Sequence, residues 1–447
     1  MKKTLFLVSL LALFTAGAFA QEKEKPTFKF YGFVRNYACY DTRESLTSNS
    51  EQFYYMPKDI KLNEMGEDLN ALDNIMLLSI TTRLGLNVNG LNFLGSKTSA
   101  KIEADFAGFG TSNTVLRIRQ AYAKMDWKYS KVLVGQAWHP AMGDMMPDVF
   151  SLETGAPFTP FSRSPQVRYD YDTKNVKLTA TALYQFQYTS YGPDGASFNY
   201  ARNAIVPEMY FQGIIKSGDF MMGLGVDVLA LKPRQLYTTT VQKYQSDYIY
   251  AADGTPIVDE AGNHVMGLTP VGNPISITRK CNEELMVSVT PTLFASYKKN
   301  NWGVKGRVTY AQNAAHMSMI SGYAVTEKLD NGAWRYSSIN SIGGWVDATY
   351  KQPLKTGYLT FCCFAGYTKN LGCMNDIEGD IYMRGEKNMD YMWRVAPSVL
   401  YTHNAMQIGI EYNPTTVGYG KPDSKYNMSD VHAVTNHRIC AMLKYNF

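Results

Sequence analysis

Polar and apolar residues alternate along most of this chain of 447 residues. The clearest case is the segment of residues 78–89, where Leu84 and Leu86 have one parity and Arg83 and Asn87 have the other. A period of two places the two sets on opposite faces of a β-strand. Short turns and long polar loops alternate as the connections between such segments. This order predicts antiparallel hairpins.

The alternating segments predict about 16 strands, with 14 and 18 as alternatives because weak strands beside long loops are easily missed. An even number of strands brings both chain ends to the same side of the sheet. The expected strands span residues 27–40, 78–89, 100–106, 115–127, 131–138, 166–171, 176–188, 205–216, 220–231, 285–298, 302–312, 339–351, 357–368, 391–402, 405–413 and 435–447.

The last of these segments ends the chain on an aromatic residue. Ile439, Leu443 and Phe447 share its apolar face, and Arg438 lies on the other face. This pattern resembles the sorting signal of bacterial outer-membrane barrels. The alternative is an ordinary half-buried strand at the end of a soluble sheet.

The first residues resemble a secretory signal peptide. Met1-Lys2-Lys3 is basic, the run from Leu5 to Phe14 is apolar, and Ala18-Phe19-Ala20 has the small-x-small pattern of a cleavage site. We therefore expect residues 1–20 to be removed and residues 21–447 to form a single barrel domain. Gln21 is not a cysteine, which argues against a lipoprotein.

The composition favours a sheet that crosses a membrane. No later stretch of about 18 uncharged apolar residues occurs, so the sequence holds no helical span. Tyr, Phe, Gly and Thr are abundant, and the mean hydropathy is negative. A transmembrane barrel combines a polar inner face with an apolar outer face, and the bilayer requires the sheet to close. A soluble sandwich or propeller would need a core on both faces or a repeat, and neither is evident.

The cysteines and histidines show no metal-binding spacing, so we expect no metal and no cofactor. Cys362 and Cys363 point to opposite faces of one expected strand and cannot pair easily. A pair between Cys363 and Cys373 stays open. The six cysteines are Cys39, Cys281, Cys362, Cys363, Cys373 and Cys440.

A loop without periodicity, residues 139–164, follows the fifth expected strand. A barrel of this size is too wide to be filled by the side chains of its wall, so something must narrow it. The loop is rich in Pro, Gly and Met and carries few charges, so we expect it to fold inward as the third extracellular loop. A trimer contact or a surface position is the alternative. Its charged residues include Asp144, Asp148, Glu153 and Arg163.

Strand parity places a set of basic residues on the inner face of the barrel. We expect them to line the pore opposite the acidic residues of the loop, because opposed rows of charge orient solutes and bias ion selectivity. The alternative is that they form salt bridges within the wall. The set comprises Arg83, Arg117, Arg119, Arg168 and Lys177.

Five segments together resemble the DcaP-like porins of the Bacteroidetes type, over essentially the whole mature chain. The resemblance implies a passive, trimeric diffusion porin for small hydrophilic and often anionic solutes. The N-terminal coiled coil of some DcaP proteins has no counterpart here, so trimerisation through it does not follow. The segments are LRIRQAY at residues 116–122, GQAWHP at 135–140, RSPQVRY at 163–169, RGEKNMD at 384–390 and EYNPTTVGYG at 411–420.

The expected function is therefore that of an outer-membrane porin with a water-filled channel, in contact with lipid and small hydrophilic solutes. The mature chain carries 42 Lys+Arg against 39 Asp+Glu, or +3, which predicts a modest anion preference. The sequence has no basic tract that would indicate a nucleic-acid partner, and no GxSxG motif that would indicate an enzyme. The alternative is an adhesin or partner-binding barrel that acts through long extracellular loops, above all residues 233–282.

Overall fold

The computed structural model describes residues 25–48, 53–108, 115–150, 154–251, 255–281 and 284–447. These residues form a closed antiparallel barrel of 16 strands, which confirms the predicted fold class and strand number. The expected signal peptide lies outside the described residues. Among the helices that are described, none is both long and apolar enough to span a bilayer.

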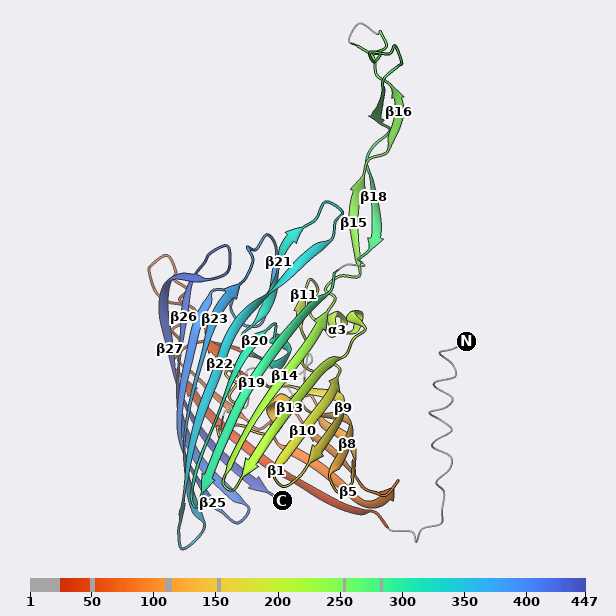
Figure 1. The fold of residues 1–447 in the computed structure, drawn as a ribbon. Coiled ribbons are helices and arrows are strands. Elements are labelled where there is room, and N and C mark those ends of the chain that lie inside the picture. The colour runs from red at the N-terminus through yellow and green to blue at the C-terminus, as the bar shows by residue number, and fades with distance from the viewer. Residues whose placement is uncertain (1–24, 49–52, 109–114, 151–153, 252–254, 282–283) are drawn as a thin grey trace.

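The barrel strands run obliquely around a common axis, and each pairs with its neighbours in antiparallel register (Figure 1). They are β1 (Thr27–Asp41), β5 (Arg83–Phe93), β6 (Ser96–Asp105), β7 (Arg117–Asp126), β8 (Ser130–Trp138), β9 (Arg163–Asp172), β10 (Val176–Leu183), β13 (Glu208–Ser217), β14 (Phe220–Leu231), β19 (Met286–Lys299), β20 (Trp302–Gln312), β22 (Trp334–Pro353), β23 (Tyr358–Cys373), β25 (Met389–His403), β26 (Met406–Pro422) and β27 (Met428–Asn446).

Shorter elements lie in the connections. A brief strand, β4, pairs with β1 beside β5, while β21 and β24 extend the wall at the end that carries the long loops. They are β2 (Ser45–Ser48), β3 (Phe53–Pro57), β4 (Asn74–Leu78), α2 (Pro140–Gly143), β11 (Tyr191–Gly192), β12 (Gly195–Ala196), α3 (Asn199–Ala204), η1 (Ala315–Met317), β21 (Gly322–Lys328) and β24 (Ile381–Met383).

The barrel closes between its first and last strands. β1 pairs with β27 from Phe33 opposite Asn446 to Asp41 opposite Arg438. Gly32 and the terminal Phe447 exchange two backbone hydrogen bonds of 3.0 and 3.1 Å. The first and last expected strands, residues 27–40 and 435–447, are therefore neighbours in the barrel.

The outer face of the barrel is apolar. In β27, Ile439 and Leu443 are 44% and 43% exposed, whereas Arg438 and Cys440 are each 5% exposed. The exposed side chains face away from the barrel and the buried ones face its interior, as their parity predicted. An apolar band of this kind is what a lipid-facing wall requires.

The expected strand of residues 78–89 is wrong in one respect, because the structure divides it. β4 ends at Leu78 and β5 begins at Arg83. Between them the backbone N–H of Thr82 donates to the carbonyl of Ser79 (3.1 Å), which forms a turn. A backbone bond between residues three positions apart is typical of a β-turn.

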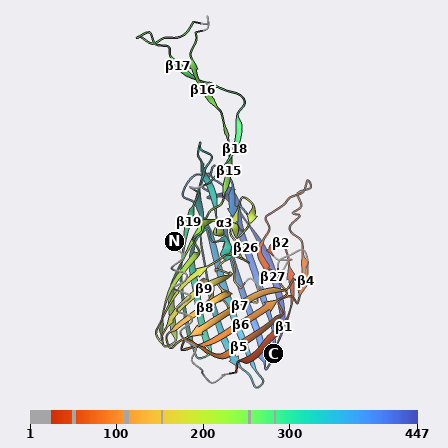
Figure 2. The ribbon, with the colours of Figure 1, turned by 90° about the vertical axis from the view of Figure 1, so that its right-hand side faces the viewer.

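The expected loop of residues 233–282 is instead largely a β-ribbon. β15 (Leu236–Val241) pairs with β18 (Ile275–Lys280), and β16 (Tyr244–Tyr248) pairs with β17 (Met266–Pro270). The ribbon projects far beyond the barrel (Figures 1 and 2). Water surrounds both of its faces, so its sequence shows no clear alternation of polar and apolar residues.

Candidate functional site

The segment between β8 and β9 packs as a compact unit rather than as an exposed loop. It begins with α2, whose N-cap is His139: the imidazole Nδ1 accepts a hydrogen bond from the backbone N–H of Ala141 (3.1 Å). Met142 and Phe158 are fully buried. Because these apolar side chains are shielded, the loop is held in one place by packing.

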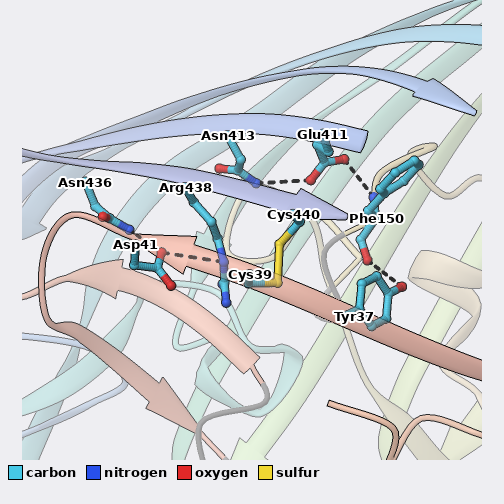
Figure 3. Close-up of a disulfide and its surroundings, with 9 residues drawn as sticks. All are labelled: Tyr37, Cys39, Asp41, Phe150, Glu411, Asn413, Asn436, Arg438 and Cys440. Carbon is cyan, nitrogen blue, oxygen red and sulfur yellow. Dashed lines mark hydrogen bonds and ion pairs between the residues drawn. A yellow bond between two sulfur atoms is a disulfide. The ribbon is translucent and has the colours of Figure 1, made fainter. Parts of the chain in front are cut away.

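Polar contacts join this segment to strands on the other side of the barrel. The backbone N–H of Phe150 donates to Glu411 Oε2 of β26 (2.7 Å), and the Tyr37 hydroxyl of β1 donates to the Phe150 carbonyl (2.8 Å; Figure 3). The backbone N–H of Asp148 donates to Asp347 of β22. Glu411, Tyr37 and Asp347 are buried on the inner face of the wall, so the loop crosses the lumen.

Four charged residues of β6 and β7 form a buried network in the wall. Arg117 makes two bonds to Asp105, of 2.9 and 2.8 Å. Arg119 bonds both Glu103 (3.0 Å) and Asp105 (2.7 Å). Arg83 Nη1 lies 3.5 Å from Glu103. These three predicted pore residues thus contact carboxylates of a neighbouring strand rather than those of the loop.

The acidic residues of the loop contact other basic residues. Lys177 Nζ lies 2.6 Å from Asp144 Oδ1, so one predicted pair of wall and loop charges is in contact. Asp148 instead pairs with Lys305 of β20 (2.8 Å). Arg168 bonds Asp170 of its own strand (2.9 Å). Glu153 lies outside the described residues.

Arg163 was expected in the loop, but it is the first residue of β9, where it pairs with Trp138. Its guanidinium is fully buried, lies 4.7 Å from the Trp138 ring and donates to the Tyr188 hydroxyl (2.8 Å). Stacking on aromatic rings partly replaces the hydration that this cation loses. Arg163 therefore marks the place where the loop rejoins the wall.

A cavity of about 380 Å³ lies beside the loop. Pro147 and Asp148 line it on the loop side, and Arg35, Lys351 and Lys444 line it on the wall side. Three basic residues and one acidic residue give this part of the lumen a positive balance. Clefts lined by one sign of charge focus the electric field and raise the local concentration of ions of the opposite sign.

A disulfide joins the two sides of the barrel seam. Cys39 of β1 and Cys440 of β27 are register partners, both are buried on the inner face, and their sulfur atoms are bonded (Figure 3). Cys363 and Cys373 are free, so the pair that the sequence left open is not formed.

Among known proteins, this chain is similar to several solved structures. No family model and no curated protein matches the sequence. The outer membrane channel DcaP of Acinetobacter baumannii matches with a TM-score of 0.61 and 18% identity, over 96% of this chain and 100% of that chain. The fold is porin-like. In-vitro folded OmpT, an outer membrane protein of Vibrio cholerae, matches with a TM-score of 0.50 and 12% identity, over 96% of this chain and 100% of that chain.

The predicted resemblance to DcaP is thus supported at the level of the fold, and the Bacteroidetes type stays a prediction. Sequence reasoning missed other buried arginines of the porin-like barrel, among them Arg307 and Arg394. Arg307 stacks on Phe294 and donates to the Met145 carbonyl of the loop (3.2 Å), and Arg394 donates to the Tyr55 carbonyl (3.1 Å). Parity within β20 could have found Arg307, because it shares a face with Lys305.

Proposed function

We propose that this protein is a diffusion porin of the bacterial outer membrane, with a water-filled channel for small hydrophilic solutes and a modest anion preference. The single observation that carries the proposal is a loop anchored across the lumen of a closed 16-strand barrel. We infer that such a loop narrows the channel. The apolar outer band and the porin-like fold agree with this function.

The anion preference rests on the basic side of the lumen beside the loop. Arg35, Lys351 and Lys444 face Asp148 across the same cavity. The pore-lining role proposed for Arg83, Arg117, Arg119, Arg168 and Lys177 is limited by their carboxylate partners, which offset part of their charge. The net bias is therefore small.

Single-channel recording in a planar bilayer tests the proposal. We expect stepwise conductance and a reversal potential of the anion-selective sign in a potassium chloride gradient. Liposomes that contain the protein should swell in small sugars. A purified, folded protein that produces no conductance and no swelling would contradict a porin, and a cation-selective channel would contradict the anion preference alone.

The route to the membrane and the assembly state belong to the same proposal. We propose that residues 1–20 are cleaved on export and that three copies assemble into a homotrimer. N-terminal sequencing of the mature protein should begin at Gln21. Mass spectrometry from mild detergent should give three chains for each particle, and a monomer there would contradict the trimer.

The ribbon favours a second function, the binding of a partner at the cell surface. It projects beyond the barrel and exposes apolar side chains, such as Tyr244 (59%) and Leu268 (71%). Its base is fixed: the Glu284 carboxylate accepts bonds from Arg234, the Trp334 backbone N–H (2.9 Å) and the Tyr336 hydroxyl (3.0 Å). Deleting residues 236–280 should leave conductance unchanged and abolish cell adhesion if this function holds.

A further inference from the structure

Two histidines and two carboxylates from four separate segments meet on the inner side of the barrel. His139 precedes α2, Glu208 opens β13, Asp227 lies in β14, and His316 lies in η1. Each of the four side chains is at most 2% exposed. The histidines looked scattered in the sequence, and only the closed barrel brings two of them together.

The ligand atoms of this cluster are closely spaced. His139 Nε2 lies 2.8 Å from Glu208 Oε1 and 3.6 Å from Asp227 Oδ1. His316 Nε2 lies 3.2 Å from the same Glu208 oxygen and 4.0 Å from Asp227 Oδ2. Ligands of a tetrahedral zinc ion, with bonds of about 2.0–2.2 Å, lie about 3.3–3.5 Å apart. The ligand atoms of His139, Glu208 and Asp227 all lie within 4.8 Å of one another, so small shifts would bring these three to that spacing.

The charges of the cluster are also suited to a cation. Within the described part of the chain, the ion-pair partners of Glu208 and Asp227 are these two histidines alone. Asp227 Oδ1 is buried and has no hydrogen-bond partner there. Two carboxylates removed from water are costly unless they are neutralised, and one divalent cation would neutralise both.

We propose that His139, Glu208 and Asp227 bind a divalent transition-metal ion, that His316 moves in beside Glu208 as the fourth ligand, and that zinc is the ion that best suits the set. Imidazole and carboxylate ligands suit zinc, while the cluster lacks the thiolates that softer ions prefer. The histidines belong to the loop across the lumen and to the connection after β20, whereas the carboxylates belong to the wall. A bound metal would therefore tie two inner segments to β13 and β14.

Metal binding would change one hydrogen bond of the loop. A neutral histidine that binds a metal through Nε2 carries its proton on Nδ1 and cannot accept a bond there. The Nδ1 of His139 accepts the N–H of Ala141, so the metal would displace this N-cap of α2. His316 Nδ1 has no hydrogen-bond partner among the described residues, so metal binding by His316 would break no hydrogen bond at this atom. The metal-bound and metal-free loops should therefore differ at the first turn of α2.

Zinc binding to the purified, tag-free protein in detergent tests the site. The protein is stripped with a chelator, dialysed against zinc chloride and analysed by elemental mass spectrometry. We expect one zinc ion for each chain in the wild type and in His403→Gln, a control at an exposed histidine. We expect at least tenfold weaker binding in His316→Gln and Asp227→Asn. Equal zinc content in the wild type and in a folded His316→Gln protein would overturn the proposal.

A second measurement needs no variant. Crystals of the wild-type protein soaked in zinc chloride should give an anomalous difference peak at the zinc edge between these four side chains. A zinc-soaked crystal without a peak there would overturn the site, whether or not the variants fold. Neither measurement uses transport, so each result is independent of the porin proposal.

Discussion

Cys39 lies directly opposite Cys440 across the seam between β1 and β27, and a disulfide joins the two residues. Nine residue pairs of the same two strands are in register, the cysteine pair included. The seam is thus held by backbone hydrogen bonds and by one covalent link. The link faces the lumen, close to the place where the crossing loop is anchored through Tyr37.

Replacing both cysteines, Cys39→Ser with Cys440→Ser, should lower stability without preventing closure. A disulfide that closes a long segment typically contributes about 2–4 kcal/mol, chiefly by restricting the unfolded chain. Heating in detergent and following the shift in gel mobility should show a lower transition temperature for the double variant. Cys363→Ser, at a free and exposed cysteine, is the control and should behave as wild type.

Removing positive charge from the cavity beside the loop should weaken anion preference. At about 8 Å in water one charge contributes about 0.5 kcal/mol, or about twofold in permeability ratio. We expect Lys351→Ala and Lys444→Ala each to move the reversal potential toward cation selectivity by that amount. Lys421→Ala, at an exposed residue, should leave the reversal potential unchanged. In high salt, the differences in reversal potential between the variants and the wild type should become smaller. An unchanged reversal potential in the variant that carries both substitutions, Lys351→Ala and Lys444→Ala, would show that these lysines do not contribute to ion selectivity.

The double substitution Arg117→Ala with Arg119→Ala should affect the stability of the fold more strongly than the current through the channel. The change leaves Asp105 and Glu103 buried without their nearest cations, which typically costs about 3–5 kcal/mol for a broken buried pair. We therefore expect a lower thermal transition temperature together with a shift toward cation selectivity. Normal stability would show that water enters the network and solvates the carboxylates.

Tyr37→Phe should loosen the loop across the lumen. The change removes only the hydroxyl that donates to the Phe150 carbonyl, a bond that contributes about 1 kcal/mol. We expect more frequent fluctuations of the open-channel current at the same mean conductance. Tyr445→Phe, on the outer face, is the matched control. Current noise that is equal in the two variants would contradict an anchoring role of this hydroxyl.

Deleting Phe447 should reduce insertion into the outer membrane. We expect this terminal aromatic to act as the sorting signal, and its backbone exchanges two hydrogen bonds with Gly32. Phe447→Tyr preserves both features and should insert normally. Surface levels measured by immunoblotting of membrane fractions provide the comparison, and wild-type levels of the truncated chain would rule out this signal.

Glu284→Gln should loosen the base of the ribbon. Burial alone would raise the pKa of Glu284, but Arg234 and the Trp334 N–H hold the pKa below its ordinary value. The charged anchor is therefore retained above about pH 4.3 and lost as the pH falls through the lowered value. At neutral pH we expect faster tryptic cleavage after Arg279 and Lys280 in the variant. Glu327→Gln, in an exposed ion pair with Arg335, should leave the cleavage rate unchanged.

The sequence predicted the barrel because lipid faces one side of each strand and imposes a period of two. The ribbon has water on both sides, so its strands left no such pattern. Parity also placed Arg117 and Arg119 on the polar face, but their partners depend on the register that sets Asp105 opposite Arg117. The same limit applies to Cys39 with Cys440, and to His139 with Glu208, because each pair joins distant segments.

The disulfide also determines how the protein would respond to a pulling force. Cys39 and Cys440 are 401 positions apart, and the bond makes everything between them a covalent ring. Tension applied to the two ends of the chain would pass directly from one sulfur to the other. Only the residues before Cys39 and after Cys440 could be drawn out, so the ring would bear no load until the disulfide is reduced.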